Sequence, residues 1–309
     1  MNRFKWLPVL VVTILFPFFF ISGPDYYSSR SFRELWNFGH IVFFAAVGLL
    51  LITRVPAIAS RSFSRQLFWV GLFALVTGIV IELVQYSIQR EPDIGDVGRN
   101  LLGAIVAVVF LSPRRNELRR GRRLMAKGLV LLLIALPVFS LLMTFYDEQH
   151  SRHTFPMLAS FESSGELDRW SGSAHFSRSN QHAIHGDHSL RVDLGTEQYS
   201  GISMGYFEGD WSRFHSLSVE LFNAESSSLS LTLRIHDKQH GRSNQLFQDR
   251  FNRSFSLKPG WNHLEIDLHD IAGAPASRAM DLSAIEQVGF FVIAEKTKTT
   301  IYMDQLYLK

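Results

Sequence analysis

The sequence predicts a multi-domain membrane protein, in which an all-α bundle of five transmembrane helices is followed by an all-β jelly-roll sandwich. Two observations predict this. Apolar runs long enough to cross a bilayer crowd into residues 1–149, and the hydrophobic pattern changes from helical to alternating after residue 150. A content of 47% hydrophobic and 19% charged residues excludes a disordered or fibrous chain. The absence of cysteine excludes disulfides, thiolate metal sites and a cysteine nucleophile.

Five segments of the first half are predicted to be transmembrane helices, because a helix of roughly 17 to 25 apolar residues pairs every backbone amide internally. The fourth segment reaches that length only by including Asp96, Arg99 and Asn100. A cleaved signal peptide is the alternative for the first segment, but no clean small-x-small cleavage site follows it, so we expect it to be retained. The expected helices cover residues 6–22, 38–53, 67–87, 95–112 and 128–145 of a domain spanning residues 1–149.

The distribution of charge predicts the orientation. Residues 1–149 carry 16 Lys and Arg against 9 Asp and Glu, whereas residues 150–309 carry 15 against 19. Of the basic residues in the first half, 12 fall on one side of the expected membrane and 4 on the other. Because Lys and Arg near span ends stay on the cytoplasmic side, we expect a cytoplasmic N-terminus and, after five spans, an extracytoplasmic C-terminal domain. The acidic second half gives no reason to expect nucleic acid as a partner.

Polar residues inside the expected spans or close to their outer ends form a candidate site, since each ionisable side chain near lipid costs roughly 2.5 to 3.5 kcal/mol. Glu82 and Gln85 continue a face of small residues on the third segment, and Asp93, Asp96 and Asn100 do so on the fourth. Two interpretations stay open: an interhelical lock without a ligand, or a site for a lipid headgroup or small ligand near the outer leaflet. The seven residues of this polar cluster are His40, Glu82, Gln85, Arg90, Asp93, Asp96 and Asn100.

The order of these residues carries a resemblance. A histidine is followed by E-x-x-Q and then by R-x-x-D-x-x-D-x-x-x-N-x-x-G, which ends at Gly103. Over residues 30–112 the chain resembles the VanZ-like membrane proteins of bacteria, whose prototype is associated with glycopeptide-antibiotic resistance. It departs from that family at residues 36–39, where members often carry an acid and a lysine. The resemblance implies a multi-pass protein of the bacterial inner (plasma) membrane, and it names a class of protein rather than a reaction.

The second half is predicted to be a sandwich of about nine strands over residues 158–309, joined to the helices by a linker at 150–157. Apolar residues alternate in residues 217–221, 229–235 and 264–268, as strands with one buried face require. Turn-forming clusters separate them. In the last strand the alternation slips by one residue near Asp304 and Gln305, which predicts a β-bulge.

Several short motifs of this half together resemble the galactose-binding-like jelly rolls that serve as carbohydrate-binding modules, over residues 158–309. They lie at residues 161–162, 186–192, 259–262 and 302–306. The resemblance implies a structural calcium between an acid near the first strand and one in the last strand, here Glu162 and Asp304. Carboxylate oxygens suit that ion. The alternative is that both are ordinary surface acids.

A glycan-binding face is expected on the polar side of the strands, opposite the inward leucines. Its candidate residues are Glu220, Arg234, His236 and His263, beside Thr232 and Glu265. A merely solvated face is the alternative. Trp170, Trp211 and Trp261 suit either sugar stacking or the core, and we expect Trp261 in the core. The loop histidines His182, His185 and His188, spaced by three and accompanied by Asp187, suggest a zinc site, although Gly186 breaks any helix that would align them.

These observations predict a bacterial cell-envelope protein that is not an enzyme. Its β-sandwich would bind a polysaccharide or cell-wall glycan, and its polar cluster a membrane lipid headgroup or a cell-wall-related ligand. The alternative is a membrane enzyme acting on a lipid-linked glycan, with Glu82 or Asp96 as the acid or base and Arg90 holding a phosphate. The sequence contains no nucleophile elbow, phosphate loop or HExxH motif.

Overall fold

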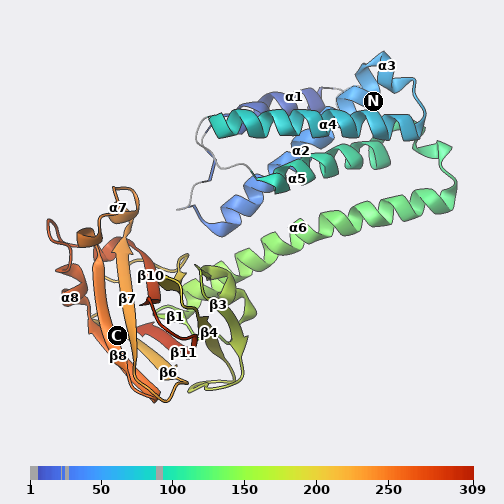
Figure 1. Cartoon of the computed structure of the whole chain (residues 1–309). Coiled ribbons are helices and arrows are strands. Elements are labelled where there is room, and N and C mark those ends of the chain that lie inside the picture. Colours follow the sequence, from blue (N-terminus) through green and yellow to red (C-terminus); the bar gives the residue numbers. More distant parts are fainter. Residues whose placement is uncertain (1–5, 22, 25–27, 88–92) are drawn as a thin grey trace. The chain divides into compact units, whose positions relative to one another are not determined.

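The computed structural model describes all residues except 1–5, 22, 25–27 and 88–92 (Figure 1). The chain divides into two compact units, Met1–Thr144 and Phe145–Lys309. Each unit contains its own cluster of buried apolar side chains. The first unit is helical, and the second is mainly β-structure.

Within the described part of the helical unit, four helices are long and apolar enough to cross a membrane, one fewer than the five predicted. The first predicted span differs because α1 gives way to a short 3-10 helix at Phe16, where Pro17 lacks the amide that an α-helix needs. The second starts at Arg30 instead of residue 38, capped by the side chain of Ser29. The helical elements are α1 (Leu7–Leu15), η1 (Phe16–Phe19), α2 (Arg30–Arg54), α3 (Pro56–Ala59), α4 (Phe63–Ser87), α5 (Ile94–Val106), the π-helical η2 (Ala107–Leu111), η3 (Pro113–Glu117) and α6 (Arg120–Thr154).

Helix α5 packs against both α2 and α4, and small residues make the contacts close. A Cβ added at Gly103 would lie 2.4 Å from the carbonyl oxygen of Ile41, and one at Gly78 would lie 2.8 Å from Nδ2 of Asn100. Two of the polar residues on α5, Asp96 and Asn100, are therefore buried against the neighbouring helices.

Helix α6 extends further than predicted and takes up most of the expected linker at 150–157. It continues to Thr154, and only Phe155 and Pro156 separate it from the first strand. The last turns of α6 are held by buried contacts within the second unit, such as the ion pair between Asp147 and Arg169.

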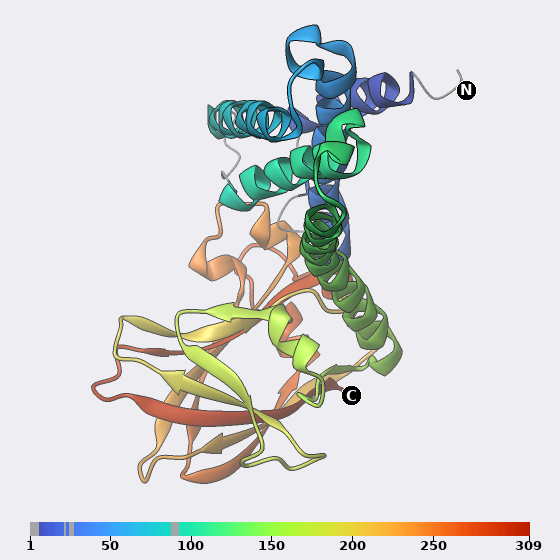
Figure 2. The ribbon, with the colours of Figure 1, turned by 90° about the vertical axis from the view of Figure 1, so that its right-hand side faces the viewer.

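The second unit is an antiparallel sandwich of two sheets (Figure 2). The first sheet has the order β3-β4-β11-β6-β9 with β1 beside β11, and the second sheet has the order β2-β5-β10-β7-β8. The strands are β1 (Met157–Ala159), β2 (Trp170–Gly172), β3 (His175–Ser179), β4 (Ser189–Leu194), β5 (Tyr199–Met204), β6 (Ser216–Asn223), β7 (Leu229–Asp237), β8 (Phe251–Leu257), β9 (Gly260–Asp267), β10 (Ile285–Ile293) and β11 (Thr299–Leu308). Short helices connect them: η4 (Ser164–Arg169), α7 (Lys238–Gly241), η5 (Phe247–Asp249), α8 (Leu268–Ala272) and η6 (Leu282–Ala284).

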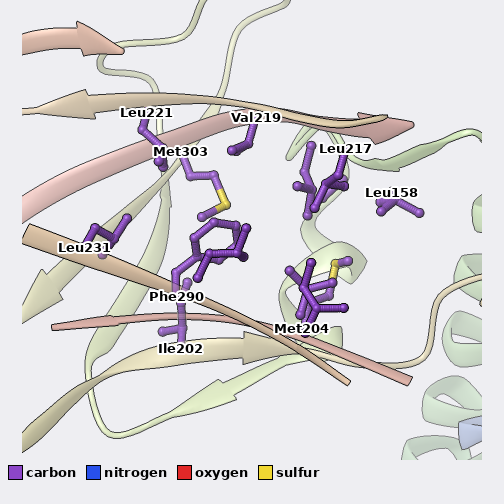
Figure 3. Packing of buried hydrophobic residues seen from close by; sticks show 14 of the residues in the cluster. Leu158, Ile202, Met204, Leu217, Val219, Leu221, Leu231, Phe290 and Met303 are labelled. Atoms are coloured by element: carbon purple, nitrogen blue, oxygen red, sulfur yellow. The ribbon is translucent and has the colours of Figure 1, made fainter. Parts of the chain in front are cut away.

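The core lies between the two sheets. Figure 3 shows Leu221 and Met303 of the first sheet pointing toward Ile202 and Phe290 of the second. The inward alternation predicted for residues 217–221 and 229–235 is confirmed, because the apolar residue at every second position is buried. The bulge is also confirmed, by a register shift between Asp304 and Tyr307.

The prediction for Trp261 is wrong. Trp170 and Trp211 are buried, but Trp261 is 39% exposed. Trp261 lies on β9 at the same parity as the outward His263 and Glu265, so it points out of the sandwich. It contacts the ring of Phe222 edge-on, with 5.3 Å between ring centroids.

Candidate functional site

A groove of about 570 Å³ runs across the outer face of the second sheet. All five strands of that sheet contribute to it, together with the segment that leads into β8. Its lining residues are Gly172, Ser173, Tyr199, Gly201, Ile202, Ser203, Thr232, Arg234, Phe247, Arg250, Asn252, Ser254, Phe291 and Ile293.

Aromatic rings form the apolar part of this groove. Tyr199 at the start of β5 is 58% exposed, and its ring centroid lies 6.1 Å from that of Phe291 on β10. Phe247, in the short helix before β8, is 68% exposed. Exposed rings of this kind offer flat apolar surface to a ligand.

The floor of the groove is polar and ordered around Arg234. Its Nη2 donates to Oγ of Ser203 at 3.1 Å and to Oε1 of Gln287 at 2.8 Å, and its guanidinium lies 5.9 Å from the ring centroid of Phe291. Gly289 leaves room for this arrangement, because a Cβ there would lie 2.8 Å from Oγ of Ser203. The guanidinium is thus held against the sheet instead of extending into solvent.

Two polar atoms at the β8 side of the groove are buried without a hydrogen-bond partner among the described residues. They are Nε of Arg250 and Oδ1 of Asn252. Asn252 is oriented by its Nδ2, which donates to the carbonyl of Phe247 at 3.2 Å. Burial lowers the pKa of Arg250 from its ordinary value. Buried polar atoms are costly to leave unpaired, and both side chains are partly exposed in the groove, which makes Arg250 and Asn252 candidates for contact with a ligand.

The structure does not bring the four predicted glycan-binding residues together, and this corrects the prediction. Glu220 on β6 and His263 on β9 belong to the first sheet, where Nδ1 of His263 lies 2.7 Å from Oε1 of Glu220. Arg234 and His236 lie on β7 of the second sheet. Alternation separates inward from outward residues, but a sandwich has two outward faces. Of the four, only Arg234 lines the groove.

Five residues of the groove were not predicted from the sequence: Tyr199, Phe247, Arg250, Asn252 and Phe291. A signal was available for β8, where Phe251, Phe255 and Leu257 alternate with the residues that face the groove. For Tyr199 and Phe291 the sequence offers no comparable signal, because only the pairing of β5 with β10 places them side by side.

His236 lies beside the groove residues on β7 but is buried, and burial lowers its pKa to about 4. His236 binds a proton near pH 6.5 in the unfolded chain but only near pH 4 in the folded chain. The sandwich therefore loses stability as the pH falls from 6.5 to 4. We expect its free energy of unfolding to drop by about 1 to 2 kcal/mol more between pH 7 and pH 5 than that of the His236→Gln variant. Chemical denaturation of both proteins at the two pH values checks this. An equal change in the free energy of unfolding for the wild type and the variant would refute it.

The predicted calcium ligands Glu162 and Asp304 both hold the loop before β4. Oδ2 of Asp304 accepts from the amides of Ile184 and His185 at 2.7 and 3.0 Å, and Oε1 of Glu162 accepts from two later amides of the loop, each at 3.0 Å. Burial raises the pKa of Asp304. These carboxylate oxygens already accept amide hydrogens of the loop, and a structural calcium between Glu162 and Asp304 stays a prediction. The described residues contain no group of three or more His, Asp or Glu that could hold a metal ion.

Two of the three loop histidines have separate side-chain partners. The ring of His182 stacks on Phe222, with 3.7 Å between centroids. His188 instead contacts Oε2 of Glu162 at 3.3 Å and Nη2 of Arg178 at 2.9 Å. The suggested zinc site is therefore not assembled by these side chains.

In the helical unit the structure brings most of the polar cluster together. Nδ1 of His40 lies 2.9 Å from Oδ1 of Asn100, and its Nε2 lies 3.4 Å from Oδ2 of Asp96. Arg99 forms ion pairs with Asp96 at 2.5 Å and with Asp93 at 2.9 Å. It was not among the residues predicted for the cluster. Its spacing of three from Asp96 was the available signal.

The remaining members extend this network. Oε2 of Glu82 accepts from the backbone amide of Asp93 at 2.9 Å. Gln85 donates to the carbonyl of Phe19 at 2.8 Å, and the ring of Phe19 packs against that of His40. Arg90 lies outside the described residues. Contacts of this kind among α2, α4 and α5 are those that an interhelical lock requires.

An apolar cavity of about 280 Å³ adjoins this network, because His40 also contributes to its wall. The other lining residues come from the end of α1, from η1 and from the first part of α2: Leu15, Phe18, Phe19, Phe32, Leu35, Trp36 and Gly39. Among the described residues its wall is thus mainly apolar, with the imidazole of His40 as its ionisable group.

Fold and site together define the class of this chain: an apolar helical unit followed by a β-sandwich with an aromatic and polar groove. No family model and no curated protein matches it, so the VanZ-like resemblance of residues 30–112 stays a prediction. Among solved structures, the chain is similar to a family 11 carbohydrate-binding module from Clostridium thermocellum in complex with a β-1,3-1,4-mixed-linked tetrasaccharide. The identity is 18%, the TM-score 0.39, and the match covers 49% of this chain and 93% of that one.

Two other solved structures show similarities of the same order. An exo-β-agarase is 18% identical with a TM-score of 0.41, over 50% of this chain and 24% of the agarase. A family 30 carbohydrate-binding module of a cellulosomal cellulase from Clostridium thermocellum is 11% identical with a TM-score of 0.34, over 45% of this chain and 90% of that one. Similarities this distant do not assign a ligand.

Proposed function

We propose that this chain is a membrane-anchored protein that binds a glycan in the groove of its second sheet. The observation that carries the proposal is the combination of exposed rings with fixed polar groups in one groove. A sugar ring has an apolar face that can lie on Tyr199 or Phe291, and hydroxyl groups that can pair with polar side chains such as Asn252. The groove opens on a sheet face, which suits an extended polysaccharide or cell-wall glycan.

The proposal places the helical unit in the bacterial inner membrane. Its support is the apolar surface of α4 and α6, where large side chains such as Phe68, Leu83 and Leu132 are more than half exposed. Water disfavours apolar surface of that extent, whereas lipid accommodates it. The basic residues on one side of the expected spans support an extracytoplasmic sandwich. A cytoplasmic N-terminus requires in addition that the shorter apolar segment Leu7–Phe19 crosses the membrane as the first of five spans. Reporter fusions to the C-terminus test this orientation.

A lipid headgroup or cell-wall-related ligand at the polar cluster stays a prediction. The contacts of His40 with Asn100 and Asp96, and of Glu82 with Asp93, are made within the cluster and favour the interhelical lock. For the same reason no observation favours the enzymatic alternative, in which Glu82 or Asp96 would transfer a proton.

Removing the aromatic surface tests the glycan proposal. We expect Tyr199→Ala and Phe291→Ala each to weaken glycan binding about tenfold, because each removes a ring on which a sugar would stack. The measurement is retention of the full chain in detergent on a panel of immobilised polysaccharides. Trp261→Ala is the matched control, since it removes an exposed ring from the other sheet.

Two results would count against the groove. If Trp261→Ala weakens binding and the two groove variants do not, the ligand lies on the first sheet. If no polysaccharide in a broad panel is retained, the sandwich does not bind glycans.

A further inference from the structure

We propose that the glycan held in the groove is anionic, carrying carboxylate or sulfate groups that pair with Arg250. This inference rests on the proposed glycan function and names the chemical class of the ligand. The lining residues include two arginines, Arg234 and Arg250, but neither Asp nor Glu among the described residues.

Arg250 carries the argument. It is only partly exposed, its Nε is buried, and within the described residues its guanidinium has neither a hydrogen bond nor an ion pair. The guanidinium makes a cation–π contact with the ring of Phe247, whose centroid lies 5.5 Å from the guanidinium carbon. A partly buried charge without a counter-charge is costly, and the lowered pKa of Arg250 has burial as its main cause. An anionic ligand would relieve this cost.

The strand that follows Arg250 shows the contrast. Arg253 on β8 faces away from the groove, opposite Leu233, and pairs with Asp270 at 3.0 Å. The fold therefore supplies an acidic partner for the arginine outside the groove and no such partner for Arg250 inside it.

The surroundings of Arg250 indicate an anion attached to a sugar ring. The exposed rings of Tyr199 and Phe247 line the same groove as the guanidinium. A free inorganic anion would gain nothing from these rings, whereas a uronate or a sulfated sugar can stack on a ring while its charged group meets the guanidinium. Arginine is suited to this task because its planar fork can donate two hydrogen bonds to a carboxylate or a sulfate.

The experiment compares polymers that share a backbone and differ in charge. One pair is polygalacturonate and its methyl ester, and the second pair is dextran sulfate and dextran. Binding to the full chain in detergent is measured at low and high salt for the wild type, Arg250→Gln, Arg250→Lys and Arg253→Gln. We expect the wild type to bind the charged member of at least one pair about tenfold or more tightly than its neutral partner at low salt, because charge-assisted hydrogen bonds add to the stacking.

The variants test whether Arg250 causes the preference for the charged polymer. Arg250→Gln should abolish the preference, Arg250→Lys should keep part of it, and Arg253→Gln should leave it unchanged. A preference for polygalacturonate alone identifies a carboxylate ligand, and one for dextran sulfate alone identifies a sulfate ester; both support the inference. Thermal unfolding of each variant separates loss of the contact from loss of the fold.

Failure of the inference and failure of the proposed function look different. Equal binding of charged and neutral polymers that still depends on Tyr199, or a preference unchanged in Arg250→Gln, overturns the anionic inference and leaves glycan binding in place. Binding of neither charged nor neutral polymers overturns both.

Discussion

Replacing Arg169 with leucine is expected to destabilise the β-sandwich by about 3 to 5 kcal/mol, because it leaves a carboxylate buried without its partner. Arg169 ends η4 and makes two hydrogen bonds to the carboxylate of Asp147 on α6, from Nε at 2.9 Å and from Nη2 at 2.6 Å. Both side chains are less than 5% exposed. Nη1 of Arg169 also donates to the carbonyl of Leu158 at 3.2 Å, so the substitution removes a second buried interaction.

The loss can be measured as the free energy of unfolding of the full chain in detergent, followed by tryptophan fluorescence, since Trp170 adjoins the substituted residue. A double variant, Arg169→Leu with Asp147→Leu, should recover a large part of the loss, because it removes the uncompensated charge as well. Arg253→Gln is the surface control: its pair with Asp270 is exposed and should contribute less than about 1 kcal/mol. A single variant that loses no more than this control would show that the pair does not anchor α6 to the sandwich.

The two-part architecture was predictable because each half follows one hydrophobic period. Long apolar runs predicted helices, and the alternation along β6 and β7 predicted which side chains enter the core. The slip of that alternation near Asp304 predicted the bulge. These features depend on neighbours in the sequence, so a local pattern carries them.

Helix ends were predicted less well, because apolar content indicates which residues could lie in lipid, whereas a helix can continue beyond them through polar residues. Helix α2 begins at Arg30, in a polar stretch that the capping side chain of Ser29 stabilises, and α6 continues past residue 145 through polar residues held by Asp147. Pro17 was a signal for the break in the first segment, but the long apolar run on both sides of it favoured one continuous helix.

The candidate site was the least predictable feature, since strand order decides it. Glu220 and Arg234 both follow the outward alternation, yet β6 and β7 are in different sheets. The groove arises where β5, β10, β7 and β8 lie side by side, and these pairings join residues as far apart as Tyr199 and Ile293. Nothing local in the sequence encodes those pairings. The polar cluster was predicted better. Small and polar residues at spacings of three and four on two segments were enough to predict that Asp96 and Asn100 face a neighbouring helix.

The helical unit provides the second large effect. Gly103→Ala is expected to destabilise it by about 3 kcal/mol, because the new methyl group would meet backbone atoms that cannot rotate away. A Cβ at this position lies 2.4 Å from the carbonyl oxygen of Ile41 and 3.0 Å from the amide nitrogen of Ala45. Helices α2 and α5 would have to separate, and the hydrogen bond between His40 and Asn100, which joins the same two helices, would lengthen or break.

The loss of helical structure with increasing SDS, followed by circular dichroism at the helix band, measures this effect on the full chain. Gly98→Ala is the matched control on the same helix, because a Cβ at Gly98 meets no atom within 4 Å. Its higher helix propensity should leave the unit as stable as the wild type or raise its stability by up to about 1 kcal/mol. If Gly103→Ala proves as stable as Gly98→Ala, then α2 and α5 do not pack at Gly103, and the polar network that depends on their contact cannot act as the lock inferred for it.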